Sequence, residues 1–268
     1  MFAANGGSPC WKGQNMKLFD SHAHYEDAMF DRDRDECLSR LEEDGIQYVL
    51  NCCSDVSVFE TVLSIVETYP AVYGSIGVHP HWVQETPHDY LKQIAACLSN
   101  PKIKAVGEMG LDYFYDDPKD LQKRIFKEQL ALAKDFDLPV IIHDRLAHED
   151  CIRILKEYRP CGVLHRYGGP VELLQEAFSW GMYVSFSNDL TYPEWNQPHI
   201  DCLLAAPWDR ILVETDCPYT PPKERENDRC LSKDVKTVVE TIARLRHVSE
   251  EFVAERTLEN AMRLYRIS

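Results

Sequence analysis

The sequence contains no long apolar run, no paired-cysteine motif and no excess of basic residues. No stretch approaches the roughly 18 consecutive apolar residues that a membrane-spanning helix needs, so we expect a soluble protein that does not enter a membrane. The ten cysteines are scattered and form no Cys-x-x-Cys pair, which argues against a disulfide framework and against a cysteine-type zinc knot. Several, such as Cys52 and Cys151, lie within apolar runs. We therefore expect reduced, buried thiols and a cytoplasmic location.

The beginning of the chain differs from the rest. Residues 1–15 are rich in Gly, Ser and Asn, and they lack the basic and apolar parts of a signal peptide. We expect a disordered or artefactual tail here, followed by one domain over residues 16–268. Two small domains would also fit 268 residues, but α/β domains of this size commonly fold as one unit, and a hydrophobic content of 44% is sufficient for a core.

Acidic side chains outnumber basic ones by 44 to 29, which gives a formal net charge of -15. Such a surface repels polyanions, and it lacks the wide basic footprint of proteins that grip duplex nucleic acid. Any contact with nucleic acid is therefore expected to be local. The same charge balance is common among ordinary acidic enzymes.

Short apolar runs alternate with amphipathic stretches along the chain. Eight runs are predicted as strands, at residues 17–19, 47–51, 72–77, 103–107, 139–142, 162–164, 182–186 and 210–213. Helices are predicted over stretches such as 57–69, 121–136, 171–180 and 232–247, with a final pair over 249–256 and 260–265. This alternation predicts a parallel (β/α)8 TIM barrel. A doubly wound sheet is the alternative, because the number of strands is uncertain from sequence by one or two.

Imidazole and carboxylate groups recur just after the predicted strands. They are His22 and His24 after the first strand, His79 after the third, Glu108 after the fourth, His143 after the fifth, His165 after the sixth and Asp216 after the eighth. The carboxyl ends of barrel strands converge on one mouth, where residues distant in sequence meet. Each residue alone also fits a structural role, such as a strand cap at His143. Gathered at one mouth, they would need partners, and their joint placement predicts a metal site.

This ordered set resembles the TatD-type metal-dependent deoxyribonucleases, a branch of the amidohydrolase-like barrels. The similarity extends from Met16 to about Tyr265. Its segments are Asp-Ser-His-Ala-His at 20–24, Gly-Val-His-Pro at 77–80, Gly-Glu-Met-Gly-Leu-Asp-Tyr at 107–113, Leu-Pro-Val-Ile-Ile-His at 138–143 and Glu-Thr-Asp-Cys-Pro-Tyr at 214–219. The resemblance implies that His22, His24 and Asp216 hold one cation. It also implies that His143 and His165 hold a second, with Glu108 bridging the two.

A pair of divalent cations would supply a definite chemistry. Two such ions roughly 3.5–4 Å apart clamp the attacking and leaving oxygens of a phosphodiester and lower the pKa of a shared water. Asp216 would orient that water or take its proton as a general base. Histidine-rich ligation without thiols favours zinc, with Mn, Ni, Fe or Mg as alternatives.

Further polar residues are candidates for substrate contacts. His79 is a candidate catalytic donor to a phosphate or leaving oxygen, although bracing the turn at Pro80 explains it equally well. Arg145 is placed to bind an anionic oxygen, and Arg225, in an acidic loop, either does the same or neutralises its neighbours. Tyr113 could stack on a base, but filling the rim is the simpler role.

Two segments depart from the family pattern. Residues 165–169 read His-Arg-Tyr-Gly-Gly, where the family usually has His-Cys-Phe followed by a small or hydroxyl residue and Gly. Arg166 therefore stands beside a ligand position, where it would strengthen phosphate binding or narrow the pocket toward a smaller substrate. The loop at 220–229 lacks the Asn-x-Pro ending often seen in the family.

Three functions fit these residues. The first, favoured by the resemblance, is a phosphodiesterase or deoxyribonuclease that trims DNA or RNA ends, or cleaves a small phosphoester, with a two-metal-activated water. The second is a hydrolase of a small ester, lactone or amide on the same barrel. Many such enzymes bridge their metals with a modified lysine at the fourth strand, where this chain has Glu108. The third is a scaffold that binds metal without catalysis. No sequence feature indicates an obligate protein partner.

The acidic surface predicts an end-directed nuclease. We expect the metal-loaded protein to shorten linear strands with a 3′-to-5′ or other end-directed preference, and to leave closed circular duplex intact, because the surface does not attract a duplex. Gel electrophoresis of both substrates after incubation with one preparation tests this expectation. Efficient nicking of the closed circle would contradict it.

Overall fold

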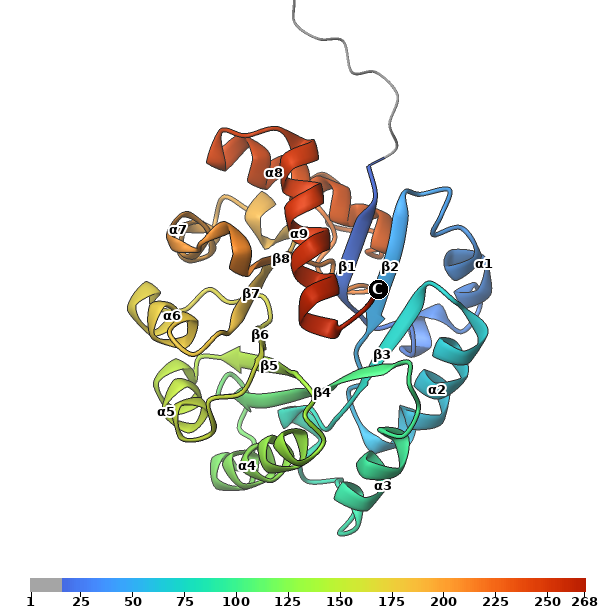
Figure 1. The fold of residues 1–268 in the computed structure, drawn as a ribbon, viewed down its shortest axis with the longest axis vertical. Coiled ribbons are helices and arrows are strands. Elements are labelled where there is room, and N and C mark those ends of the chain that lie inside the picture. Colours follow the sequence, from blue (N-terminus) through green and yellow to red (C-terminus); the bar gives the residue numbers. More distant parts are fainter. Residues whose placement is uncertain (1–15) are drawn as a thin grey trace, which may run out of the picture.

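A computed structural model describes residues 16–268, which form a barrel of eight parallel strands surrounded by helices (Figure 1). Each strand pairs with the next one along the chain, so the order in the sheet runs from β1 to β8. A doubly wound sheet would place strands out of sequence order, so that alternative is excluded. The predicted TIM barrel is confirmed, and the tail expected at residues 1–15 lies outside the described residues.

Strands and helices alternate through the described part of the chain. The strands are β1 (Leu18–Ala23), β2 (Ile46–Asn51), β3 (Val72–Ile76), β4 (Ile103–Asp112), β5 (Val140–Arg145), β6 (Gly162–Leu164), β7 (Tyr183–Phe186) and β8 (Ile211–Val213). The α-helices are α1 (Arg34–Ser39), α2 (Phe59–Thr68), α3 (Tyr90–Cys97), α4 (Lys119–Asp135), α5 (His148–Tyr158), α6 (Val171–Phe178), α7 (Gln197–Ala205), α8 (Val235–Arg246) and α9 (Glu250–Tyr265). Within residues 16–268, none of the helices is long and apolar enough to cross a membrane.

The barrel closes between β8 and β1 through hydrogen bonds near the mouth. The backbone N–H of Asp216 donates to the carbonyl of His22 over 2.8 Å. The Asp20 carboxylate adds a side-chain link, because it accepts from the Thr215 N–H at 2.8 Å and from the Thr215 hydroxyl at 2.6 Å. These contacts hold the first and last strands together, although Asp20 and Thr215 are 195 positions apart in the sequence.

Apolar side chains from successive strands fill the barrel. One buried cluster includes Phe19 of β1, Leu50 of β2, Ile141 of β5 and Leu212 of β8, and the end of α9 contributes Tyr265 to it. A larger buried cluster joins other strand residues to the surrounding helices. Because both faces of the strands are covered, the strands are apolar through most of their length instead of alternating between apolar and polar residues.

The C-terminal helix differs from its prediction. The sequence pattern predicts two short helices, over 249–256 and 260–265, whereas the structure has the single helix α9. The prediction was wrong because the helix continues through residues 257–259, the gap between the two predicted helices, where Thr257 interrupts the apolar pattern. The Thr257 hydroxyl donates to the Val253 carbonyl at 2.9 Å, and the Asn260 amide donates to the Ile211 carbonyl in β8 at 2.9 Å. These polar side chains are therefore satisfied inside the fold.

Several strands extend further toward the mouth than the sequence predicts. β4 continues to Asp112 and β5 to Arg145, so Glu108 and His143 lie within strands instead of after them. His22 likewise lies within β1. Side chains on paired strands are held more rigidly than side chains on loops, which suits a site that must keep its geometry.

The pairing of two strands is irregular beside the residues of the mouth. The register shifts in β1 between residues 20 and 23, around His22, and in β4 between residues 106 and 109, around Glu108. Such bulges change the direction in which neighbouring side chains point and are frequent beside active sites. Near the mouth, the side chains of β1 and β4 therefore do not alternate strictly between the two faces of the sheet.

Gly110 in β4 allows the close approach of β5 that places His143. Its φ is +150°, and a Cβ at this position would lie 1.9 Å from the His143 carbonyl oxygen. We expect Gly110→Ala to lower the free energy of unfolding by at least about 2 kcal/mol, because backbone strain and a backbone clash act together. Urea denaturation measures the change.

A matched control for this prediction is Gly181→Ala. Gly181 also has a positive φ, +99°, but no atom lies within 4 Å of the position that its Cβ would take. This variant therefore carries the backbone strain without the clash. Equal losses of stability in the two variants would show that the contact with His143 does not matter.

Candidate metal centre

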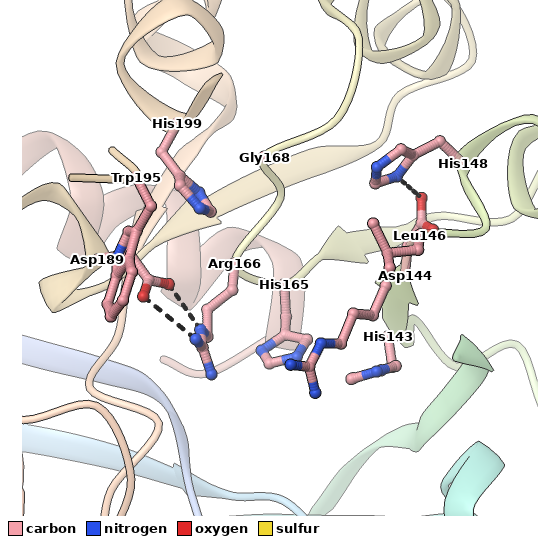
Figure 2. Close-up of a pocket in the computed structure, with 11 residues that line it drawn as sticks. His143, Asp144, Leu146, His148, His165, Arg166, Gly168, Asp189, Trp195 and His199 are labelled. Carbon is pink, nitrogen blue, oxygen red and sulfur yellow. Dashed lines mark hydrogen bonds and ion pairs between the residues drawn. The ribbon is translucent and has the colours of Figure 1, made fainter. Parts of the chain in front are cut away.

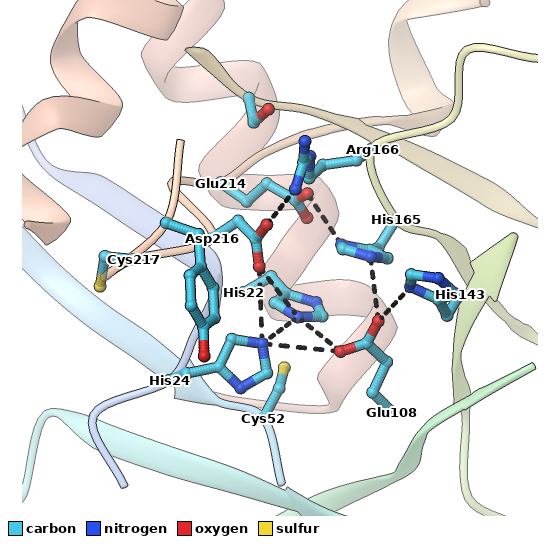
Figure 3. Close-up of polar contacts among 12 residues, drawn as sticks. His22, His24, Cys52, Glu108, His143, His165, Arg166, Glu214, Asp216 and Cys217 are labelled. Carbon is cyan, nitrogen blue, oxygen red and sulfur yellow. Dashed lines mark hydrogen bonds and ion pairs between the residues drawn. The ribbon is translucent and has the colours of Figure 1, made fainter. Parts of the chain in front are cut away.

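The Glu108 carboxylate lies at the centre of the barrel mouth and faces histidines on two sides (Figure 3). Its Oε2 lies 3.2 Å from His22 Nε2 and 3.5 Å from His24 Nε2. Its Oε1 lies 2.9 Å from His143 Nδ1 and 3.0 Å from His165 Nε2. The two oxygens of one carboxylate thus face different histidines, although His165 also lies within 4.8 Å of donor atoms of His22 and Asp216.

The first group, here named the first cation site, consists of His22, His24, Glu108 Oε2 and Asp216. Asp216 Oδ1 lies 3.7 Å from His22 Nε2 and 3.5 Å from His24 Nε2, and the two Nε2 atoms are 3.0 Å apart. Tetrahedral ligands at about 2.0–2.1 Å from a zinc ion lie about 3.3–3.4 Å from one another. The donor atoms present therefore fit a small divalent cation.

The second group, here named the second cation site, consists of Glu108 Oε1, His143, His165 and His79. His79 Nε2 lies 3.7 Å from Glu108 Oε1. The other ring nitrogen of His79, Nδ1, accepts a hydrogen bond from the backbone N–H of His81 at 3.1 Å, which turns Nε2 toward Glu108. His79 thus lies among the donor atoms of this site. It also braces the turn at Pro80, which is one of the two roles expected for it from the sequence.

Three further carboxylates contact the outer nitrogens of these histidines. Glu26 Oε1 lies 2.9 Å from His24 Nδ1, Asp112 Oδ2 lies 3.0 Å from His143 Nε2, and Glu214 Oε1 lies 3.2 Å from His165 Nδ1. Carboxylates in this position fix the orientation of a ligating imidazole and make it more basic. Glu26, Asp112 and Glu214 were not among the site residues predicted from the sequence.

A sequence signal for these residues exists in hindsight. Glu26 continues the alternation of acid and imidazole that begins at Asp20, with one such residue at every second position up to 26. Asp112 and Glu214 lie inside the segments at 107–113 and 214–219 that carry the family resemblance. Their partners, however, come from other strands, so the pairing itself is visible only in the folded protein.

The mouth buries six carboxylates among its imidazoles. The carboxylates of Glu26, Glu108, Asp112, Asp189, Glu214 and Asp216 all belong to residues that are at most 5% exposed. Within residues 16–268, Arg166 is the one Lys or Arg side chain that pairs with any of them. Burying several carboxylates close together is costly, and divalent cations would balance this charge directly.

The electrostatic environment affects the histidines of the mouth in two ways. Burial opposes the protonation of His24, His143 and His165, but the neighbouring carboxylates outweigh it and raise the pKa of each of these imidazoles. Burial and the neighbouring His165 lower the pKa of His22, and burial together with His143 lowers the pKa of His79 well below its usual value. Burial alone would raise the pKa of Glu108, but the surrounding imidazoles outweigh it and hold this pKa well below its usual range. Neutral imidazoles and an ionised carboxylate are the forms that ligate metal, so a bound cation would replace the protons of His24, His143 and His165.

Arg166 pairs with two carboxylates of the protein. Its Nε donates to Asp189 Oδ2 at 2.8 Å, and its Nη1 donates to Asp216 Oδ2. Burial opposes the ionised form of Asp216, but Arg166 and His24 outweigh it and lower the pKa of this carboxyl. The arginine that departs from the family pattern therefore positions Asp216, whose other oxygen remains at the first cation site.

A cavity of about 490 Å³ opens beside the second cation site (Figure 2). Its lining includes His143, His165, Arg145, Arg166 and Trp195. A volume of this size is within the range of sites for small molecules. The cavity therefore gives a substrate access to the histidines.

The other candidate substrate contacts are placed differently. Arg145 is exposed at the cavity, and its guanidinium lies 3.9 Å from the centre of the Phe114 ring. Tyr113 donates its hydroxyl to Asp150 at 2.6 Å, and Arg225 pairs with Asp234. The cavity lining contains neither Tyr113 nor Arg225.

The parallel barrel and its histidine–carboxylate centre define a metal-dependent hydrolase. A family model described as TatD related DNase matches residues 19–266, which is nearly the whole chain. The chain belongs to this TatD family, and it is an enzyme that hydrolyses ester bonds.

Several similar proteins cover the chain almost completely. YabD of Bacillus subtilis, described as an uncharacterized metal-dependent hydrolase, is 36% identical over 94% of this chain and 100% of its own length. A protein of Erwinia tasmaniensis described as the 3′-5′ ssDNA/RNA exonuclease TatD is 29% identical over 93% of this chain and 100% of its own. The crystal structure of YjjV, a TatD homolog from Escherichia coli, matches with a TM-score of 0.89 and 28% identity over 95% of this chain and 100% of that one.

The contact between Glu214 and His165 generates a prediction about metal affinity. We expect Glu214→Gln to weaken binding at the second cation site by about 10- to 100-fold, because the amide no longer supplies the negative charge that orients His165. Competition with a zinc-binding dye measures the affinity. The control is Glu42→Gln, which removes an exposed carboxylate. Unchanged affinity in the Glu214 variant would argue against a cation at His165.

Proposed function

We propose that this enzyme is a phosphodiesterase that trims single-stranded DNA or RNA from an end and uses two divalent cations. The observation that carries the proposal is the position of Glu108, whose two oxygens face different histidines. Zinc is the ion that we favour, with Mn, Ni, Fe or Mg as alternatives, because imidazole nitrogens dominate the donor sets. When bound, such ions supply Lewis acidity and lower the pKa of a water molecule.

The residues of the chain divide the remaining work. His22, His24 and Asp216 would hold one cation, His143 and His165 the other, and Glu108 would bridge them. Asp216 would also orient the attacking water, and Arg166 would keep its carboxylate in place through Oδ2. Arg145, exposed at the cavity, would bind a phosphate oxygen of the substrate.

Two observations support a nucleic-acid end as the substrate: the net charge of the chain and its similarity to the Erwinia protein. The formal net charge of -15 disfavours the wide grip on a duplex, so recognition must be confined to the mouth. The Erwinia relative bears the description of an exonuclease acting on single-stranded DNA and RNA. We extend that description to this chain as a hypothesis.

Two further features of the enzyme belong to the same proposal. We propose that residues 16–268 form one domain, since the barrel closes between its first and last strands. We also propose that the enzyme works in the cytoplasm. Nine cysteines in the described residues are free, and most are buried, which fits a reducing compartment.

Elemental analysis combined with a substrate panel tests the function. The panel contains single-stranded DNA and RNA, closed duplex, a nitrophenyl phosphodiester, a phosphomonoester and a lactone. We expect two metal ions per chain and turnover of diesters, with single strands preferred. Turnover confined to the lactone or to a simple ester would favour the alternative, a hydrolase of small esters, lactones or amides, for which the cavity is also large enough.

The role of Asp216 leads to a specific expectation. Asp216→Asn should keep the fold and at least one metal ion, because the second cation site does not use this residue, but it should lower diester turnover by at least about 100-fold. Circular dichroism, elemental analysis and initial rates measure these properties. The control is Asp228→Asn, at an exposed carboxylate in the loop that follows the same strand. Normal turnover by the Asp216 variant would refute the assignment.

A further inference from the structure

Exposed apolar side chains gather around the mouth of the barrel. The described residues include nine exposed large hydrophobic side chains, and seven of these, among them Trp82, Phe114, Tyr115, Trp195 and Tyr219, lie on segments that follow strands. All such segments lie at the mouth, because parallel strands all end at the same side of the barrel. Exposed apolar groups concentrated in one place indicate a surface that binds something.

Trp195 forms one side of the cavity. It follows β7, is 55% exposed, and stacks on Tyr192 with ring centres 4.8 Å apart and planes at 22°. The Tyr192 hydroxyl donates to the Pro221 carbonyl at 2.7 Å, which anchors this pair to the loop after β8. Figure 2 shows Trp195 and His199 on one side of the cavity, and Leu146 and His143 on the other. Trp195 is thus a flat, supported ring at the edge of a cavity that reaches the second cation site.

Phe114 and Arg145 form a second flat surface. Phe114 follows β4 and is 55% exposed, and the Arg145 guanidinium lies over its ring at 3.9 Å. The ring centres of Tyr115 and Phe114 are 4.8 Å apart, with planes at 84°, and Tyr115 also packs on His81 with 4.1 Å between ring centres. Arg145 contacts Phe114 and also lines the cavity. The Arg145 guanidinium therefore lies between Phe114 and the histidines of the cavity.

We propose that Trp195 and Phe114 are stacking platforms for two bases of an unpaired nucleic-acid strand, which places the phosphate between those bases at the cation sites. The inference rests on the nuclease function proposed above and adds the residues that select a single strand. Bases have exposed faces only when they are unpaired and unstacked, and aromatic rings bind them without sequence preference. Stacking also supplies affinity that the acidic surface cannot supply through charge.

Variants of the two rings test the proposal. With metal-loaded enzyme and a single-stranded oligothymidylate, Trp195→Ala and Phe114→Ala should each raise KM by about tenfold and change kcat by less than about twofold. Trp195→Phe should restore most of the affinity, because it keeps a flat ring. The matched control is Phe136→Ala. Phe136 is 43% exposed but follows a helix, at the opposite end of the barrel, and its loss should leave KM unchanged.

Removing bases from the substrate completes the test. A strand of equal length built from abasic tetrahydrofuran residues keeps the phosphates and lacks the rings. The wild type should show a raised KM for it, and the two alanine variants should show the same KM as the wild type on this strand, because nothing is left to stack. A strand with a single abasic position should identify which base each ring binds.

The possible outcomes separate the two claims. If the wild type cleaves the oligothymidylate and both alanine variants keep its KM, the stacking platforms are refuted while the nuclease function stands, and the rings serve another partner such as a protein. If the alanine variants lose affinity equally for the normal and the abasic strand, the rings act on the fold and the inference also fails. If the wild type cleaves no diester, both claims fall.

Discussion

Histidines in β1, in β5 and directly after β6 converge on the two oxygens of one buried carboxylate, Glu108, and the rest of the mouth is arranged around this convergence. The neighbours of this carboxylate include further buried carboxylates. Within residues 16–268, Arg166 is the one Lys or Arg side chain that pairs with any of these carboxylates. Two divalent cations would satisfy the donors and balance the charge at once. The residues that bind metal would then also be residues on which the stability of the mouth depends.

The surroundings of this centre hold it in one geometry. Glu26, Asp112 and Glu214 contact the outer nitrogens of three histidines and so limit the rotation of the rings. Arg166 joins the loop after β6 to Asp216 after β8 and to Asp189 after β7. The resemblance to the family predicts a cysteine at this position. Here the larger, charged side chain is accommodated as an ion pair within the protein, which makes Arg166 a residue that positions Asp216.

Much of this architecture could be predicted from sequence, and particular residues show where prediction stops. Alternating apolar runs predict the barrel, and imidazoles at strand ends predict that His22, His143 and His165 meet. The length of α9 could not be predicted, because Thr257 and Asn260 find their acceptors only in the folded chain. The partners of Arg166, Tyr113 and Arg225 lie on other elements, so their ion pairs and hydrogen bonds were equally invisible. Trp195 and Phe114 lie in loops that are distant in the sequence, and no shared sequence pattern links the two loops.

The account depends on two cations that share Glu108. Anomalous X-ray diffraction from crystals grown with zinc or manganese measures this directly, because it locates each ion independently of the protein atoms. The account predicts two peaks about 3.5–4 Å apart, one on each side of the Glu108 carboxylate. A single peak away from Glu108, or no peak at the mouth in metal-saturated crystals, would contradict it.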